Sequence, residues 1–187
     1  MTHPFVFRGK ASHLLQPTVL ALALAALFAG AQPAGAAEMH LKIAIPKLGV
    51  AEYHRPYLAA WIERADQSVA ANLAVWYDMR MKNQEGEKWL KDMRQWWRRS
   101  GRELQMPVDG VSGATRAPGE HKLNLGGGKG PVDTLAPGDY VLMVEAAREV
   151  GGRELVKVPF QWPPKAAGQA SGQGGSELGA VSLEWTP

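Results

Sequence analysis

Hydrophobic and polar residues alternate along several short stretches of the chain, and a period of two is typical of β-strands. In the first stretch, aliphatic side chains occupy every second position at Leu41, Ile43 and Ile45, until Pro46 ends the pattern. Similar patterns predict further strands over residues 57–63, 121–125, 140–150, 155–162 and 181–185.

The stretch over residues 70–81 differs, because large side chains stand on both of its faces. Leu73, Val75 and Tyr77 point one way, whereas Trp76 points the other way. This pattern predicts a strand that is covered on both sides.

Between residues 87 and 100 the hydrophobic period changes to three and four, which predicts one amphipathic helix. Its apolar face carries Trp89, Leu90, Met93, Trp96 and Trp97. Its other face is basic and carries Lys88, Lys91, Arg94, Arg98 and Arg99. Gly101 is a suitable residue to end this helix.

Short alternating strands separated by turn residues favour a mainly β fold, an antiparallel β-sandwich, here with one inserted amphipathic helix. We expect a signal peptide at residues 1–36 and a sandwich domain at residues 37–164. Residues 165–187 are rich in Gly, Ala and Ser in their first part, which predicts a flexible tail with a possible edge strand.

The N-terminus has the three parts of a secretory signal peptide. Arg8 and Lys10 are basic, residues 19–29 are apolar, and Ala34-Gly35-Ala36 matches a cleavage site. The apolar run is shorter than the about 20 residues that a spanning helix needs, so we expect a periplasmic protein without a membrane span after cleavage. Removing the two bases lowers the formal net charge from +3 to +1, which gives no reason to expect nucleic-acid binding.

The sequence contains no cysteine, which excludes disulfides, a lipoprotein anchor, thiolate metal sites and cysteine nucleophiles.

One stretch with candidate chemistry follows the predicted helix, within a segment expected to be irregular. Residues 109–115 read Asp-Gly-Val-Ser-Gly-Ala-Thr. This pattern resembles the acceptor site of a periplasmic FAD:protein FMN transferase, which implies that FMN is joined through its phosphate to the hydroxyl of Thr115. The alternative is an ordinary turn of small residues.

A wider resemblance covers residues 41–162. The residues that carry it are Trp61, Ile62, Trp89, Met93, Arg94, Trp96, Trp97, Arg98, the stretch 112–119, the Pro-Gly-Asp-Tyr stretch 137–140 and the stretch 144–149. The chain resembles a family of predicted periplasmic proteins of unknown function that accompany PepSY-type membrane reductases and the FMN transferase. The resemblance implies extracytoplasmic electron transfer, and residues 137–140 also look like a late strand of an immunoglobulin-like domain.

The residues around Thr115 suggest how FMN would be held. Gly113 and Ala114 leave room for the transferase, and Asp109 and Ser112 belong to the same acceptor stretch. Arg116 is a candidate partner for the phosphate, as are Arg98, Arg99 and Arg102 on the preceding segment, unless these arginines are simply solvated. Trp96 and Trp97 are adjacent, so one of them is a candidate to stack on the flavin ring, unless both serve packing.

Other groupings are weaker. His40, Glu52 and His54 do not have a recognised metal-binding spacing, and no metal site is expected. Ser112, His121 and Asp109 include the residue types of a hydrolase triad, but no nucleophile-elbow pattern surrounds the serine.

Three hypotheses follow. The first is a periplasmic electron carrier with covalent FMN at Thr115, which would be the transferase's substrate and not an independent enzyme. The second is a cofactor-free binding module that docks a membrane partner. The third is a carrier of a small ligand in a Trp-lined cleft.

Overall fold

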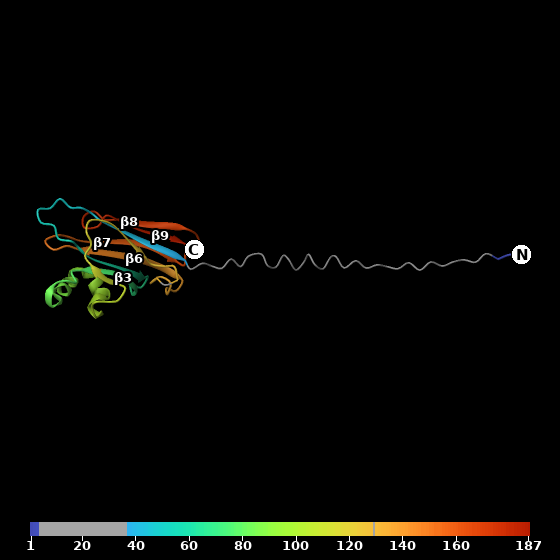
Figure 1. Cartoon of the computed structure of the whole chain (residues 1–187), viewed down its shortest axis with the longest axis horizontal. Helices are drawn as coiled ribbons and strands as arrows, with labels where there is room; N and C mark the ends of the chain where they lie inside the picture. Colours follow the sequence, from blue (N-terminus) through green and yellow to red (C-terminus); the bar gives the residue numbers. More distant parts are fainter. Residues whose placement is uncertain (4–36, 129) are drawn as a thin grey trace. The chain divides into compact units, whose positions relative to one another are not determined.

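The computed structural model describes residues 1–3, 37–128 and 130–187. Apart from its first three residues, the expected signal peptide lies outside the described residues. The described residues form two β-sheets and a helical segment, and Figure 1 shows labelled strands of both sheets lying over one another.

The first sheet has four strands in the order β5-β1-β9-β8, and all its neighbours are antiparallel. Its strands are β1 (Glu38–Ile45), β5 (Gly119–Asn124), β8 (Gly168–Gln173) and β9 (Ala180–Thr186). In β1 the expected alternation is confirmed, since Leu41, Ile43 and Ile45 are buried.

The second sheet has five strands in the order β4-β3-β2-β6-β7. Its strands are β2 (Tyr57–Arg64), β3 (Val69–Tyr77), β4 (Ser112–Ala114), β6 (Gly138–Ala147) and β7 (Arg153–Trp162). Strand β4 pairs in parallel with β3, whereas the other neighbours are antiparallel. The mainly β sandwich is therefore confirmed, with one short parallel edge that the sequence did not predict.

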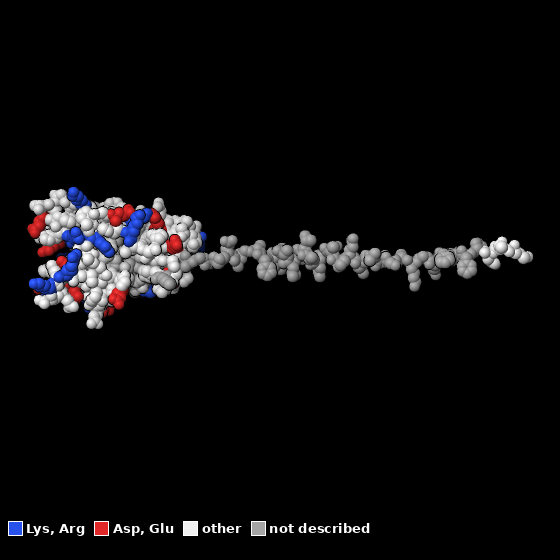
Figure 2. Space-filling model, viewed as in Figure 1, with Lys and Arg blue, Asp and Glu red and all other residues white. Residues whose placement is uncertain are grey.

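Acidic and basic side chains are interspersed over the face of the sandwich that Figure 2 shows. This mixture agrees with the small net charge of the chain without its N-terminal bases.

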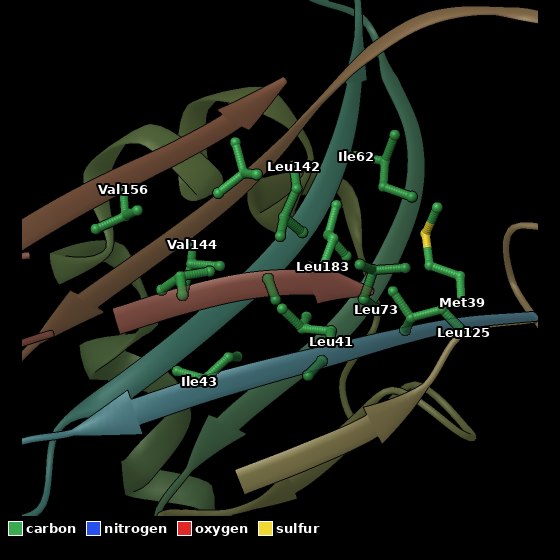
Figure 3. Packing of buried hydrophobic residues seen from close by; sticks show 14 of the residues in the cluster. Met39, Leu41, Ile43, Ile62, Leu73, Leu125, Leu142, Val144, Val156 and Leu183 are labelled. Carbon is green, nitrogen blue, oxygen red and sulfur yellow. The ribbon is translucent and has the colours of Figure 1, made fainter. Parts of the chain in front are cut away.

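The main hydrophobic core lies between the two sheets. Leu41 and Leu183 from the first sheet belong to the same buried cluster as Leu58, Leu142 and Val156 from the second. Figure 3 shows several of these side chains meeting between the strands.

The outer face of the five-stranded sheet is covered by a helical segment, which forms a second core. Trp61, Val75 and Met143 from the sheet cluster with Leu90 and Trp96 from this segment. The sheet is therefore buried on both faces, which confirms the prediction for the strand at residues 70–81.

The predicted helix at residues 87–100 is only partly correct. The structure has a 3-10 segment, η2 (Lys82–Asp92), then α1 (Arg94–Arg99) and a short η3 (Gly101–Glu103). The chain bends at Met93, which is fully buried, and Trp89 ends up 50% exposed instead of lying on the apolar face. Leu90, Met93 and Trp96 are nevertheless all buried against the outer face of the sheet.

Residues 165–187 differ from the expected flexible tail. They form β8 and β9, and β9 lies between β1 and β8 instead of at an edge. Leu178, Val181 and Leu183 are buried in the main core, so these residues complete the sandwich. Among the residues that the structure describes, no helix has the length and hydrophobicity to cross a membrane.

Candidate functional site

A cavity of about 760 Å³ opens beside the end of β4. Its lining residues fall within four separate stretches, 53–57, 78–92, 114–115 and 147–150. Ala114 and Thr115 are the part of the acceptor-like stretch that reaches it. Its volume lies in the range of small-molecule and cofactor sites, about 300–1,000 Å³.

Thr115 is held by the edge of the five-stranded sheet. Ala114 is in register with Tyr77 across the parallel β4–β3 pair. The main-chain N–H of Thr115 then donates to the carbonyl oxygen of Tyr77 at 3.3 Å. The backbone at Thr115 is thus fixed by the sheet, while its side chain lines the cavity and is half-buried.

Ser112 and Asp109 belong to the turn that precedes Thr115. The Ser112 Oγ accepts a hydrogen bond of 2.9 Å from the Val108 N–H, and the Ser112 N–H donates to the Val108 carbonyl at 2.8 Å. Gly110 has a φ of 72°, a conformation that favours glycine. Asp109 is exposed in this turn. Ser112 therefore closes the turn, and its hydroxyl has a structural role.

Gly113 and Arg116 both contact Trp76, on the core side of β4. A Cβ atom on Gly113 would approach Trp76 Cδ1 to 3.2 Å, so the glycine here permits close packing. The Arg116 guanidinium lies over the Trp76 ring, with its Cζ 5.3 Å from the ring centroid. The cavity itself is lined by other charged residues, three of them basic and three acidic: Arg55, Arg80, Arg148, Asp78, Asp92 and Glu149.

The tryptophan at the cavity is Trp89, not Trp96 or Trp97. Trp96 is fully buried, and its Nε1 donates to Asn72 Oδ1 at 2.9 Å. Trp97 is half-buried and lines a different cleft with Arg94. The regular spacing assigned Trp89 to the core face, and only the bend at Met93 reveals it as an exposed aromatic side chain.

The other arginines suggested for a phosphate also lie elsewhere. Arg98 lines the same cleft as Trp97, and the Nε of Arg99 is 3.4 Å from Glu63 Oε1. Arg102 donates to the main-chain carbonyl of Arg98 at 2.9 Å.

Two buried polar atoms belong to side chains that line the cavity. Within the described residues, the hydroxyl of Tyr53 and the Nη1 of Arg148 have no hydrogen-bond partner. The Arg148 side chain is only 6% exposed, and Glu177 holds its Nε and Nη2 at 2.8 and 3.0 Å. Burial raises the pKa of the Tyr53 hydroxyl, which keeps it protonated and able to donate. Both donors are buried beneath the cavity lining, so within the described part of the chain they are unpaired polar atoms inside the fold and not groups on the cavity surface.

The weaker groupings are separated in the structure. His54 contacts Glu52 at 2.9 Å and Glu149 at 3.5 Å, whereas His40 lies on β1, 3.7 Å from Glu38. No group of three or more potential metal ligands occurs in the part of the chain that is described. The Nε2 of His121 is 2.8 Å from the Ala117 carbonyl oxygen, and the His121 ring packs on Trp76, so its ring is not used by Ser112.

A protein-family model described as "Predicted periplasmic protein (DUF2271)" matches residues 38–180. This range contains the acceptor-like stretch and all four stretches that line the cavity. No curated protein matches the chain. No solved structure matches it either.

Proposed function

This chain belongs to the DUF2271 family of predicted periplasmic proteins, and we propose that it carries FMN covalently on Thr115 and transfers electrons for a membrane reductase. The observation that carries this proposal is the position of Thr115. The last residue of the acceptor-like stretch lies on a cavity of about 760 Å³ together with the exposed ring of Trp89.

The attachment reaction uses the Thr115 hydroxyl as the nucleophile and FAD as the co-reactant. The Thr115 Oγ1 forms a bond to the phosphorus on the FMN side of FAD, the pyrophosphate bond breaks, AMP leaves, and the hydroxyl proton is released. An FAD:protein FMN transferase supplies the catalytic groups for this step. The protein is its substrate, and the strand pairing beside Tyr77 presents Thr115 at a sheet edge.

The residues that line the cavity suit the ring and the phosphate of an attached FMN. Trp89 offers an exposed aromatic face on which a flavin ring can stack. Arg80 and Arg55 line the same cavity and provide positive charge for a phosphate.

When bound, FMN supplies the redox chemistry, and the chain's own residues bind and orient it. The proposed electron-exchange partner is a PepSY-type membrane reductase. Support for this partner is the resemblance carried by the tryptophan- and arginine-rich segment and the acceptor-like stretch.

The test is the intact mass of the protein purified from a periplasm in which an active FMN transferase is coexpressed. We expect an added mass of one FMN, mapped to the peptide that contains Thr115. Thr115→Ser keeps the hydroxyl and is expected to stay modified, whereas Thr115→Ala is expected to be unmodified and folded. Thr134→Ala is the matched control, because Thr134 is an exposed threonine in a turn away from the cavity, and its hydroxyl donates to the Pro131 carbonyl at 3.2 Å.

Three results would overturn the proposal. If the Thr115→Ala variant still carries covalent flavin, Thr115 is not the attachment site. An unmodified wild-type chain, with the transferase modifying a known substrate in the same cells, would favour a cofactor-free binding module. Colour that is present but lost on dialysis would favour a carrier of a free ligand.

A further inference from the structure

A second concave site lies on the helical segment, next to the cavity but lined by different residues. It is a cleft of about 540 Å³ between α1 and β7. Its lining includes Lys91, Arg94, Trp97, Arg98, Arg153 and Leu155. We infer that this cleft binds an acidic segment of a partner protein, and this inference does not rest on the attachment of FMN to Thr115.

The charge of the cleft carries the inference. Four of its lining side chains are cationic, and no Asp or Glu lines it. Among the described residues, no carboxylate lies within ion-pair distance of Lys91, Arg94 or Arg98. Arg153 is paired with the buried Glu145 at 2.7 Å, so the charge that the cleft offers to a ligand comes from Lys91, Arg94 and Arg98.

The shape and lining of the cleft favour carboxylates on a protein chain. Arginine guanidinium groups bind carboxylates through two parallel hydrogen bonds, and Arg94 and Arg98 lie one helical turn apart on α1. Trp97 and Leu155 are half-buried beside them and provide apolar surface for an intervening side chain. An acidic segment with an occasional apolar residue uses all of these features.

The same surface is poorly suited to a lipid bilayer. Membrane-binding helices insert a broad apolar face, but α1 has only six residues and four of them are Arg or Gln. The large hydrophobic side chains that are exposed in the described part of the chain, such as Met79, Met81 and Trp89, do not line this cleft.

The cleft and the cavity share the helical segment. Trp89 and Asp92 line the cavity, whereas Lys91 and Arg94 line the cleft. A partner held in the cleft would therefore bind beside the cavity without filling it.

The experiment is a titration of the ¹⁵N-labelled protein with a synthetic peptide of alternating Asp and Glu around one Leu. The indole N–H resonances report binding, and Trp97→Phe identifies the resonance of Trp97. We expect the Trp97 resonance to shift and the Trp89 and Trp185 resonances to stay in place. A peptide with Lys at the acidic positions is expected to cause no shift.

The matched variants each reverse two exposed cations. Arg94→Glu/Arg98→Glu is expected to weaken peptide binding by about tenfold. Lys47→Glu/Lys122→Glu makes the same change of net charge away from the cleft. This pair is expected to change the affinity for the peptide by less than about twofold. Arg94→Gln/Arg98→Gln removes the two charges without reversing them. This variant replaces Arg94→Glu/Arg98→Glu in the titration if the charge reversal lowers the melting temperature.

Equal weakening by both charge-reversal pairs would overturn the inference, because attraction would then depend only on net charge. Binding to phosphatidylglycerol vesicles without any shift by the acidic peptide would assign the surface to membranes instead. Absence of a Trp97 shift at low salt would also overturn it, whether or not the protein carries FMN.

Discussion

The carboxylate of Glu145, in β6, accepts a hydrogen bond of 2.8 Å from the main-chain N–H of Trp96, in α1. It also accepts from the Gln95 N–H at 3.1 Å and from Arg153 Nη1 at 2.7 Å. The first N–H groups of a helix have no partner within the helix, so this distant side chain satisfies them. Glu145 thereby fixes the helical segment over the outer face of the sheet.

Glu145→Ala is expected to lower the free energy of unfolding by about 1.5–3 kcal/mol, because the variant leaves buried N–H groups without an acceptor. Arg153→Ala is the control and is expected to cost less, since the Arg153 side chain is 40% exposed. Urea unfolding measures both. A loss in Glu145→Ala no larger than in Arg153→Ala would show that the salt bridge, and not the contact with α1, is what matters.

Substitutions of Trp89 and Trp96 are expected to have different effects, one on the bound flavin and the other on the stability of the fold. Trp96→Ala should lower the free energy of unfolding by about 3–5 kcal/mol, because this side chain is fully buried. Trp89→Ala should have a small effect on stability, because the side chain is 50% exposed. In protein carrying FMN, Trp89→Ala should increase the flavin fluorescence, because a stacked indole quenches it. Unchanged fluorescence in a folded, flavin-carrying Trp89→Ala would place the ring elsewhere.

The strands were predictable because one local rule determines them. In β1, every second side chain enters the core between the sheets, so the alternation of Leu41 and Ile43 with polar residues is visible in the sequence. The central position of β9 could not be predicted from the sequence, because the polar, glycine-rich composition before Val181 is equally typical of a linker.

The candidate site was predictable only at Ala114 and Thr115. The other cavity residues come from stretches as far apart as Tyr53 and Arg148, which only the pairing of β2 with β6 brings together. Trp89 was misplaced because a helical period assumes one unbroken helix, whereas the contacts of Glu145 start a new helix after Met93.

Gly86 controls how closely η2 lies against the cavity. A Cβ atom on Gly86 would clash with the main-chain oxygen of Asp78 and come within 3.2 Å of the Tyr57 hydroxyl. Because the backbone oxygen cannot easily move, Gly86→Ala should displace η2. We expect the free energy of unfolding to fall by about 1–3 kcal/mol and the melting temperature to fall by several degrees. Gly49→Ala is the control, since open space surrounds that position. Equal melting temperatures for the two variants would show that η2 is loosely held.

The loop between β8 and β9 is expected to make the fold sensitive to acid through Glu154. The Glu154 carboxylate accepts from the N–H groups of Gly175, Ser176 and Leu178 at 2.5, 3.0 and 2.8 Å. Burial raises the pKa of Glu154, but these hydrogen bonds together lower it by more, so its pKa in the folded protein lies below the ordinary 4.5.

Because the folded-state pKa is lowered, the stabilisation is complete above the unfolded-state pKa of about 4.5 and is lost as the pH falls through the folded-state value. Glu154→Gln should therefore be less stable than wild type at neutral pH, and this difference should shrink below about pH 4. Glu120→Gln, at a side chain that is 56% exposed, should show no such convergence. Urea midpoints measured from pH 7 to pH 3 test this, and a difference for Glu154→Gln that stays constant over that range would mean that the carboxylate's charge does not hold the loop.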